Sequence, residues 1–338
     1  MPLVIAMPVG LPCPIRYFKF DKLRPVIMRC SNCNKEAIIL QRYNGLHLCK
    51  KHFTESVRKR VYGEFQRQVK LRGGEHIAIA YSGGKDSTLA LYLTHEILKP
   101  MRKVTRSAII IDEGIAGYRD KGLPIARKFC RELGINLMEM SMSQHLGTTL
   151  DEIARLPRSQ STCTYCGVFR RRLMNKAARE LGADYLVTGL NLDDTAQGIV
   201  MNIFRGDIEK LARMGPHENI QEGLVPRLQP LRKIPEKESL LFCIVEGLTF
   251  YDGVCPYAHE AVRNAYREMI AKMEEDFPGT RYSILSSYDS IREALRASFP
   301  PIELNRCACG EPSVNEKCKA CQLLEEINRK KRRVRTSA

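Results

Sequence analysis

The chain has 338 residues, of which 44% are hydrophobic, so it can bury the core of one or two domains. Lys and Arg number 54 against 38 Asp and Glu, and the resulting charge of +16 indicates a polyanionic partner such as a nucleic acid. No apolar run approaches the roughly 18 residues of a membrane span. Thirteen cysteines, several in C-x2-C pairs and without a recognisable secretory leader, favour metal binding over a disulfide framework.

The N-terminal third begins with an irregular segment. Residues 1–29 are interrupted by prolines and show no periodicity, which predicts a disordered leader rather than a signal peptide. Met28 stands just before the first cysteine pair and offers an alternative start. The cysteines govern residues 30–52, and residues 55–71 then predict a basic amphipathic helix.

The central region alternates between strand and helix patterns. Strands are expected at 76–81, 107–111, 135–140 and 185–188, and helices at 88–98, 122–133, 168–181 and 195–204. This alternation is typical of an α/β fold with a doubly wound parallel sheet. Residues 206–235 carry many Pro and Gly and are expected to be irregular, whereas 236–247 and 258–277 predict helices.

The first motif with chemical content joins a strand to a helix. It reads Ser82-Gly83-Gly84-Lys85-Asp86-Ser87, and its two glycines let successive backbone N–H groups and the helix N-terminus point at an anion. The hydroxyls of Ser82 and Ser87 add donors, and Asp86 is a candidate to hold Mg2+ or to orient the loop. The spacing excludes a Walker-type P-loop. The alternative is a plain glycine turn before a helix.

Several motifs in order carry a family resemblance. SGGxDS is the signature of the PP-loop ATP pyrophosphatases, and it is followed by Asp112-Glu113-Gly114-Ile115, Cys163-Thr164-Tyr165-Cys166-Gly167-Val168-Phe169-Arg170-Arg171, Thr188-Gly189-Leu190-Asn191-Leu192-Asp193-Asp194 and Cys255-Pro256. The sequence thus resembles the TtcA/TtuA family of tRNA 2-thiolation enzymes. It is most similar to the archaeal and eukaryotic cytosolic branch, which thiolates the wobble uridine. The resemblance extends from Cys30 to Cys321.

The resemblance implies a reaction and its participants. ATP is expected over residues 82–87, with its adenine near Ile111, Asp112, Gly114 and Gly189. The family adenylates the C2 oxygen of a uridine, releases pyrophosphate and replaces the oxygen with sulfur. The implied cofactors are ATP, Mg2+, a [4Fe-4S] cluster and two Zn2+. The implied partners are tRNA and a sulfur donor, either sulfide or a ubiquitin-like thiocarboxylate carrier, in a cytoplasmic homodimer. Uridine 34 is favoured, and uridine 54 of the T-loop is the alternative.

Three cysteines are candidates for a catalytic metal centre. Cys163 and Cys166 stand just before a predicted helix, and Cys255 follows far downstream. Three protein ligands leave one coordination position open, as a catalytic site requires. In the family the matching cysteines hold the [4Fe-4S] cluster. The alternatives are a catalytic disulfide between Cys163 and Cys166 or a zinc site completed by a histidine.

Two further catalytic candidates come from matching positions in the family. Asp194 matches a proposed catalytic aspartate, and an acid there can bind metal or accept the uridine N3 proton. The alternative is an acidic helix start that complements the dipole. Arg170 matches a basic position and is expected to stabilise the adenylate or an RNA phosphate. The sequence departs from the family at Leu190, where histidine is common, and at Gln197, where glutamate is common.

A predicted structural zinc site lies near each end of the chain. Cys30, Cys33, Cys49 and His52 have the spacing of a Cys3His site. The second set is Cys307, Cys309, Cys318 and Cys321, whose first pair is C-x-C where many relatives have C-x2-C. Four protein ligands leave no open position, so neither site is expected to be catalytic. Cys130 and Cys243 are expected to be packed thiols, and Cys13 is given no role.

These features predict a domain order and leave two rival functions. The predicted order is a leader at 1–29, a zinc finger with the basic helix at 30–72, the PP-loop domain at 73–245, a helical extension at 246–300, a zinc ribbon at 301–327 and a basic tail at 328–338. One rival is a PP-loop ligase or amidase, which does not need the three central cysteines. The other is a non-catalytic zinc protein that binds RNA. Arginines at 170–172 adjoin the predicted active site and are expected to contact tRNA phosphates.

Overall fold

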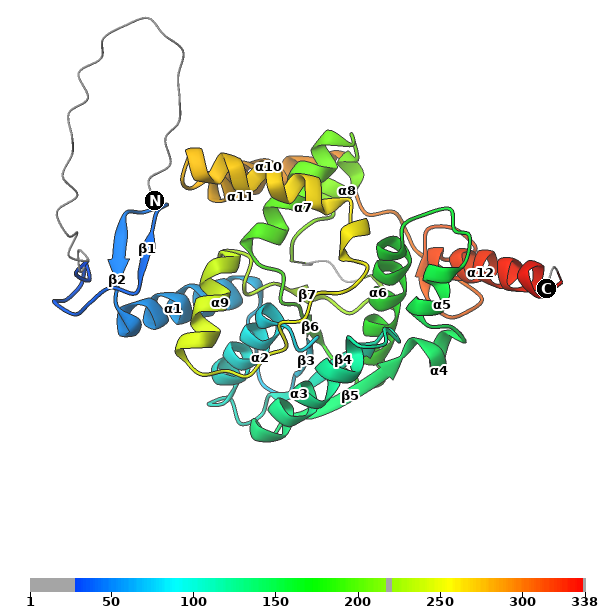
Figure 1. Cartoon of the computed structure of the whole chain (residues 1–338), viewed down its shortest axis with the longest axis horizontal. Helices are drawn as coiled ribbons and strands as arrows, with labels where there is room; N and C mark the ends of the chain where they lie inside the picture. Colours follow the sequence, from blue (N-terminus) through cyan, green and yellow to red (C-terminus); the bar gives the residue numbers. More distant parts are fainter. Residues whose placement is uncertain (1–27, 217–220, 337–338) are drawn as a thin grey trace, which may run out of the picture.

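The computed structural model describes residues 28–216 and 221–336, so the predicted leader and Cys13 lie outside the described residues. Its centre is a sheet of five parallel strands in the order β5-β4-β3-β6-β7 (Figure 1). The strands are β3 (His76–Ala80), β4 (Thr105–Asp112), β5 (Asn136–Ser141), β6 (Tyr185–Val187) and β7 (Arg227–Leu228). The chain winds outward from β3 to β5, returns to β6 beside β3, and so reverses direction between β3 and β6. The predicted doubly wound α/β fold is confirmed.

Strict alternation along the strands builds two separate cores. Ile77, Ile79 and Val187 project to one face of the sheet, whereas Ala78 and Leu186 project to the other. Helices α1 (Lys50–Gln68), α2 (Lys85–Leu98), α3 (Arg119–Glu132) and α9 (Glu236–Val245) contribute to the first core. Helices α4 (Met142–Leu146), α5 (Leu150–Arg155), α6 (Thr162–Glu180) and α12 (Lys319–Thr336) contribute to the second.

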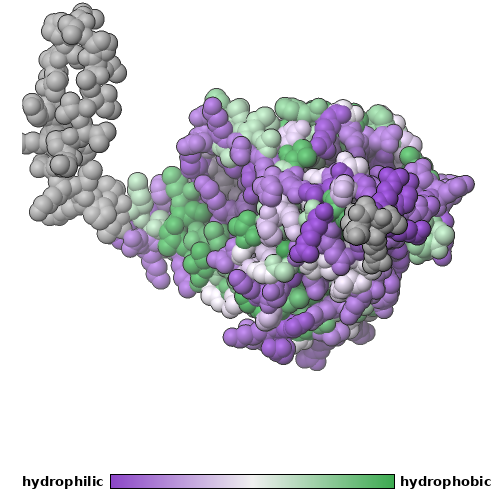
Figure 2. All heavy atoms as spheres, turned by 45° about the vertical axis from the view of Figure 1, so that its right-hand side comes forward, coloured by the Kyte–Doolittle hydropathy of each residue, from purple (hydrophilic) through white to green (hydrophobic). Residues whose placement is uncertain are grey.

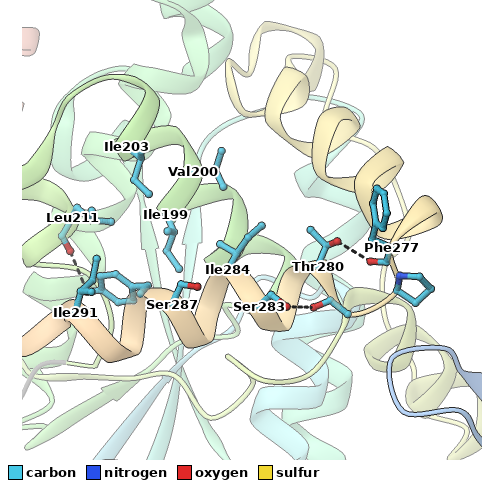
Figure 3. A pocket seen from close by; sticks show the side chains of 13 residues that line it. Ile199, Val200, Ile203, Leu211, Phe277, Thr280, Ser283, Ile284, Ser287 and Ile291 are labelled. Carbon is cyan, nitrogen blue, oxygen red and sulfur yellow. Dashed lines mark hydrogen bonds between the residues drawn. The ribbon is translucent and has the colours of Figure 1, made fainter.

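A third, smaller core lies above the sheet, where helices gather at the top of Figure 1. It is built from α7 (Leu192–Phe204), α8 (Ile208–Ala212) and α11 (Thr280–Ser298), and α10 (Arg263–Asp276) packs on α7 and α11 after a 3-10 turn (Ala258–Glu260). A pocket of about 420 Å³ opens between α7 and α11 (Figure 3). Its lining is largely apolar, with Ile199, Ile203 and Ile284 among the side chains, and it includes none of the predicted site residues.

The two cysteine-rich modules lie at opposite ends of the longest axis (Figure 1). The N-terminal module carries the hairpin β1 (Ile39–Gln41) and β2 (Leu46–Leu48), and the C-terminal one carries β8 (Asn305–Arg306) and β9 (Pro312–Ser313). Cys30 and Cys49 belong to the core on the α2 side, whereas Cys307 and Cys318 belong to the core on the α6 side. Each module is therefore packed onto the central domain through two of its own clustered cysteines.

Three sequence-based boundaries were wrong. Helix α6 begins at Thr162 instead of residue 168, because Ser161 caps it by accepting a hydrogen bond from the Thr164 N–H. The segment 206–235, expected to be irregular, contains α8 and the edge strand β7, whose two residues are too few for a periodic pattern. The expected tail at 328–338 continues α12 as far as Thr336.

The surface agrees with the high charge of the chain. Most of the face shown in Figure 2 is hydrophilic, and hydrophobic side chains gather mainly on the left-hand side of this view. Within the described residues, no helix is both long enough and apolar enough to span a bilayer.

Candidate functional site

The predicted phosphate loop lies at the carboxyl end of β3. Gly83 has a φ of +84°, a conformation that favours glycine, and Gly84 is the N-cap of α2. The Ser87 hydroxyl holds the turn closed by accepting from the Ser82 N–H at 3.1 Å and donating to the Gly84 carbonyl at 2.9 Å. A glycine-rich turn is therefore fixed at the N-terminus of a helix, with the geometry of an anion cradle.

The loop after β6 lies against this cradle, at the point where the strand order reverses between β3 and β6. A Cβ on Gly189 would lie 3.0 Å from the carbonyl oxygen of Asp86 and 3.0 Å from the nitrogen of Ser87, so any other residue would press against the backbone of the phosphate loop. Asn191 Nδ2 donates to Asp86 Oδ1 at 3.0 Å and links the two loops directly. Ligands of open α/β sheets bind outside the carboxyl ends of the strands at such a point.

Asp194 combines a structural and an electrostatic role. It completes a capping box with Asn191 at the start of α7, so the expected alternative, an acidic helix start, is realised in the geometry. Its Oδ1 also lies 3.0 Å from a guanidinium nitrogen of Arg263. Burial raises the pKa of Asp194, and Arg263 opposes that shift. A raised pKa makes this carboxylate a better proton acceptor than an exposed one.

Lys85, to which the sequence motif assigns no role of its own, forms two ion pairs in the structure. Its Nζ lies 3.0 Å from Asp86 and 2.7 Å from Glu236, the first residue of α9. The ammonium is thus neutralised by two carboxylates and ties α2 to α9. Of the residues expected near adenine, Ile111 is buried in the α6-side core and can offer only its backbone. Asp112 accepts a hydrogen bond from the Gly114 N–H at 2.8 Å.

The three central cysteines converge from two segments. Cys163 and Cys166 lie in the first turns of α6, and Cys163 donates to the Tyr257 carbonyl at 3.2 Å, two residues from Cys255. The Tyr251 N–H donates to the Gly83 carbonyl at 2.8 Å, which anchors the segment leading to Cys255 on the phosphate loop.

The three central cysteines do not form a close cluster of the kind seen in the two terminal modules. Their sulfur atoms are not drawn together within 4.8 Å as in the two terminal modules, and a tetrahedral ion with bonds of about 2.3 Å needs such closeness. All three are free thiols, so no disulfide joins Cys163 to Cys166. Burial raises the pKa of Cys166 to about 12. Three separated thiols beside a basic residue fit a larger centre such as an iron-sulfur cluster, whose binding would release their protons.

A buried ion pair that the sequence analysis missed joins the phosphate loop to the cysteines. The Glu113 side chain is 2% exposed and is bound by the guanidinium of Arg119, with one contact at 2.7 Å. Arg119 also donates to the Ser82 carbonyl at 3.0 Å, and Arg170 lies 3.8 Å from Glu113. Glu113 belongs to the motif Asp112-Glu113-Gly114-Ile115, but only the fold shows that it meets Arg119.

The terminal modules form the two closed clusters that the spacing predicts. The ligand atoms of each set lie within 4.8 Å of one another, and the sets are Cys30, Cys33, Cys49 and His52, and Cys307, Cys309, Cys318 and Cys321. Burial alone would raise the pKa of Cys30, yet backbone N–H groups of Cys49 and Asn32 lower it to about 6. A thiolate at neutral pH is the form that binds metal. The C-x-C departure at Cys307 does not prevent closure.

Comparisons with known proteins identify the class and then the family. A PP-loop domain matches residues 54–274, and the N-terminal LIM domain of 2-thiouridine synthetase TtuA matches residues 29–54. The fold and the loop at Ser82 therefore define a PP-loop protein. The tRNA 2-thiolation protein NcsA of Haloferax volcanii is 34% identical over 318 residues, which cover 89% of this chain and 99% of the relative. Cytoplasmic tRNA 2-thiolation protein 1 of Arabidopsis thaliana is also 34% identical, over 89% of this chain and 85% of the relative.

A solved structure extends the similarity to three dimensions. The U34-tRNA thiolase NcsA from Methanococcus maripaludis, determined with its [4Fe-4S] cluster, superposes with a TM-score of 0.77 at 35% identity, covering 89% of this chain and 97% of that chain. This chain belongs to the family of tRNA 2-thiolation proteins. The expected resemblance is confirmed.

Proposed function

We propose that this protein is an ATP-dependent tRNA uridine 2-sulfurtransferase acting on wobble uridine 34. One observation carries the proposal: three segments of the chain make direct contacts with the phosphate loop. Arg119 donates to the Ser82 carbonyl and binds Glu113, Asn191 at the start of α7 donates to Asp86, and the segment that leads to Cys255 is anchored on Gly83. The names of the relatives support the same activity, because they include a tRNA 2-thiolation protein and a U34-tRNA thiolase.

The chain's own residues account for ATP binding. Backbone N–H groups of the loop at Gly83 and Gly84 would take the phosphates, helped by the positive end of α2. The contact of Gly189 with the loop brings the β6 side close to the nucleotide. Asp86 and Asp194 are the carboxylates available to Mg2+.

The proposed chemistry proceeds in two displacements. The C2 oxygen of the uridine attacks the α-phosphorus, the bond to pyrophosphate breaks, and Asp194 accepts the N3 proton. Arg170 stabilises the negative charge of the adenylate. Sulfur at the oxidation level of sulfide (HS−) then attacks C2, AMP leaves with the former C2 oxygen, and the proton of the HS− ends on N3. Cys163, Cys166 and Cys255 would hold a [4Fe-4S] cluster, and the chemistry that it would supply there is the binding and delivery of that sulfide.

The remaining assignments extend the proposal. Zinc is the ion proposed for both closed clusters, because four thiolate or imidazole ligands form its usual structural site. The sulfur donor is proposed to be sulfide or a ubiquitin-like thiocarboxylate carrier, and the protein a cytoplasmic homodimer. Light scattering of the purified protein tests the dimer, and supplying each donor separately to a thiolation assay tests the sulfur source.

Mass spectrometry of tRNA nucleosides from a deletion strain tests the activity. Loss of 2-thiouridine from position 34 and its return on complementation are the expected results. Loss at position 54 alone would move the assignment to the T-loop. Unchanged 2-thiouridine at both positions would contradict the proposal. A PP-loop ligase or amidase is favoured instead if serine substitution of all three central cysteines leaves the activity of the protein intact.

A further inference from the structure

Two arginines near the cysteine site have no acceptor among the described residues. Arg171 lies on α6, five residues after Cys166, and its side chain is exposed. Arg227 is half-buried on the edge strand β7. Two other arginines nearby do have carboxylate partners: Arg170 lies 3.8 Å from Glu113, and Arg263 lies 3.0 Å from Asp194. Within the part of the chain that the structure describes, Arg171 and Arg227 are thus cations without a carboxylate.

The fold places these two cations together. Asn175, one helical turn beyond Arg171 on α6, accepts from the Val225 N–H at 3.0 Å and donates to the Gly223 carbonyl at 2.9 Å. The chain then runs from Val225 to Arg227, which is paired in register with Leu186. Leu186 belongs to the core under α6, and residues paired in register project to the same face. Arg227 therefore points to the face that α6 covers.

The Arg171 head group is directed back toward the cysteines. A Cβ on Gly167 would lie 3.1 Å from Arg171 Nη1, so the guanidinium lies over a helical position that has no side chain. Gly167 directly follows Cys166 in the sequence. Long helical side chains normally lean toward the N-terminus in this way. The cation is thereby held beside the first turns of α6, where Cys163 and Cys166 lie.

The electrostatics agree with the lack of a neighbouring carboxylate among the described residues. Burial lowers the pKa of Arg227. The surrounding protein and then the charges of Arg227, Arg170 and Arg263 lower the pKa of Arg171, although part of its side chain remains open to solvent. Like charges that are partly desolvated repel one another, and two guanidiniums suit the bidentate geometry of a phosphate.

We propose that Arg171 and Arg227 jointly bind one backbone phosphate of the substrate RNA and thereby place the uridine beside Cys163, Cys166 and Cys255. This inference rests on the proposed function, because it takes tRNA as the substrate. The ATP phosphates have their own site at the carboxyl end of β3, formed by Ser82–Ser87.

Equilibrium binding of the full-length protein to an unmodified tRNA transcript tests the proposal. R171Q and R227Q are each expected to weaken binding about 5- to 10-fold at low salt and to reduce the slope of log K against log salt by about 1. Because both side chains hold the same phosphate, the double variant should lose little more slope than either single variant. R171K should recover part of the affinity, since it restores charge without the bidentate fork.

The matched control is R131Q. Arg131 is an exposed arginine at the end of α3, on the opposite face of the sheet, and no acceptor is found for it among the described residues. This variant should bind tRNA as the unmodified protein does. Equal losses in all three variants would show a general charge effect and overturn the proposal.

Other outcomes separate this inference from the proposed function. ATP affinity, iron content and Tm should be unchanged in R171Q and R227Q, and loss of ATP affinity with intact tRNA binding would overturn the inference by assigning the pair to the nucleotide. If the unmodified protein thiolates tRNA and both variants bind tRNA with normal affinity, the proposed function stands and only this inference is overturned. Failure of the unmodified protein to bind tRNA would contradict both.

Discussion

The terminal cysteine clusters and the central cysteine site use the same residue type in opposite ways. Each terminal cluster gathers four ligand atoms within 4.8 Å of one another. In both clusters the ligands come in two pairs, and the members of a pair are two or three residues apart in the sequence. The central site draws Cys163 and Cys166 from α6 and Cys255 from a distant loop, with charged residues around them. Closed coordination stabilises a fold, whereas open coordination next to bound charges provides room for a reaction.

The largest effect should come from removing a central cysteine. C255S is expected to reduce tRNA thiolation at least about 100-fold, because the proposed cluster loses a ligand, while Tm changes by less than about 2 °C. Nucleoside mass spectrometry and iron analysis measure the result. C130A, at a packed thiol outside the site, is the control and should keep its iron. Normal activity in C255S would remove the distinction between the central and terminal sites.

Removing a terminal ligand should instead affect stability. C33S is expected to lose one of the two proposed zinc ions and to lower Tm by about 5–10 °C, because metal binding and folding are coupled. Metal analysis and thermal unfolding provide the measurements. Iron content per folded chain should stay constant. If C33S abolished iron binding while leaving zinc in place, the two kinds of site would have been assigned in reverse.

The buried Glu–Arg ion pair near the central site can be compared with an exposed Glu–Arg ion pair on the surface. E113Q breaks a buried pair with Arg119 and is expected to cost about 3–5 kcal/mol in urea unfolding. E139Q breaks a similar two-bond pair with Arg127, where the side chains are 35% and 46% exposed, and should cost less than about 1 kcal/mol. Similar losses of unfolding free energy in the two variants would contradict the view that the buried ion pair stabilises the structure around the central cysteines.

The smallest expected effect concerns the contact between the two loops. G189A would push a Cβ against the backbone of Asp86 and Ser87, and ATP binding is expected to weaken about tenfold, or about 1.4 kcal/mol. G63A is the matched control, because the nearest atom to its new Cβ, on Arg67, is 3.7 Å away. It should leave ATP affinity unchanged and stabilise α1 by up to about 1 kcal/mol. Calorimetric titration with ATP compares them.

Local patterns were sufficient for much of this protein. Alternating apolar strands and helices predicted the parallel sheet, since the periods of 2 and 3.6 residues are properties of the backbone. The glycine turn at Ser82 and the four-ligand spacings near Cys30 and Cys318 are also local, so the sequence alone predicted an anion cradle and two closed metal sites. It also predicted the family, which the comparisons confirmed.

Only the tertiary structure decided which distant segments meet around the site at the carboxyl ends of β3 and β6. The short strand β7, the Glu113–Arg119 pair and the neutralised Lys85 all depend on contacts between segments far apart in the chain. The same holds for Arg171 and Arg227, which have no sequence signal as a pair. Whether a charge is paired, buried or left without an acceptor depends on which elements pack together, and sequence spacing carries no information about that beyond a few residues.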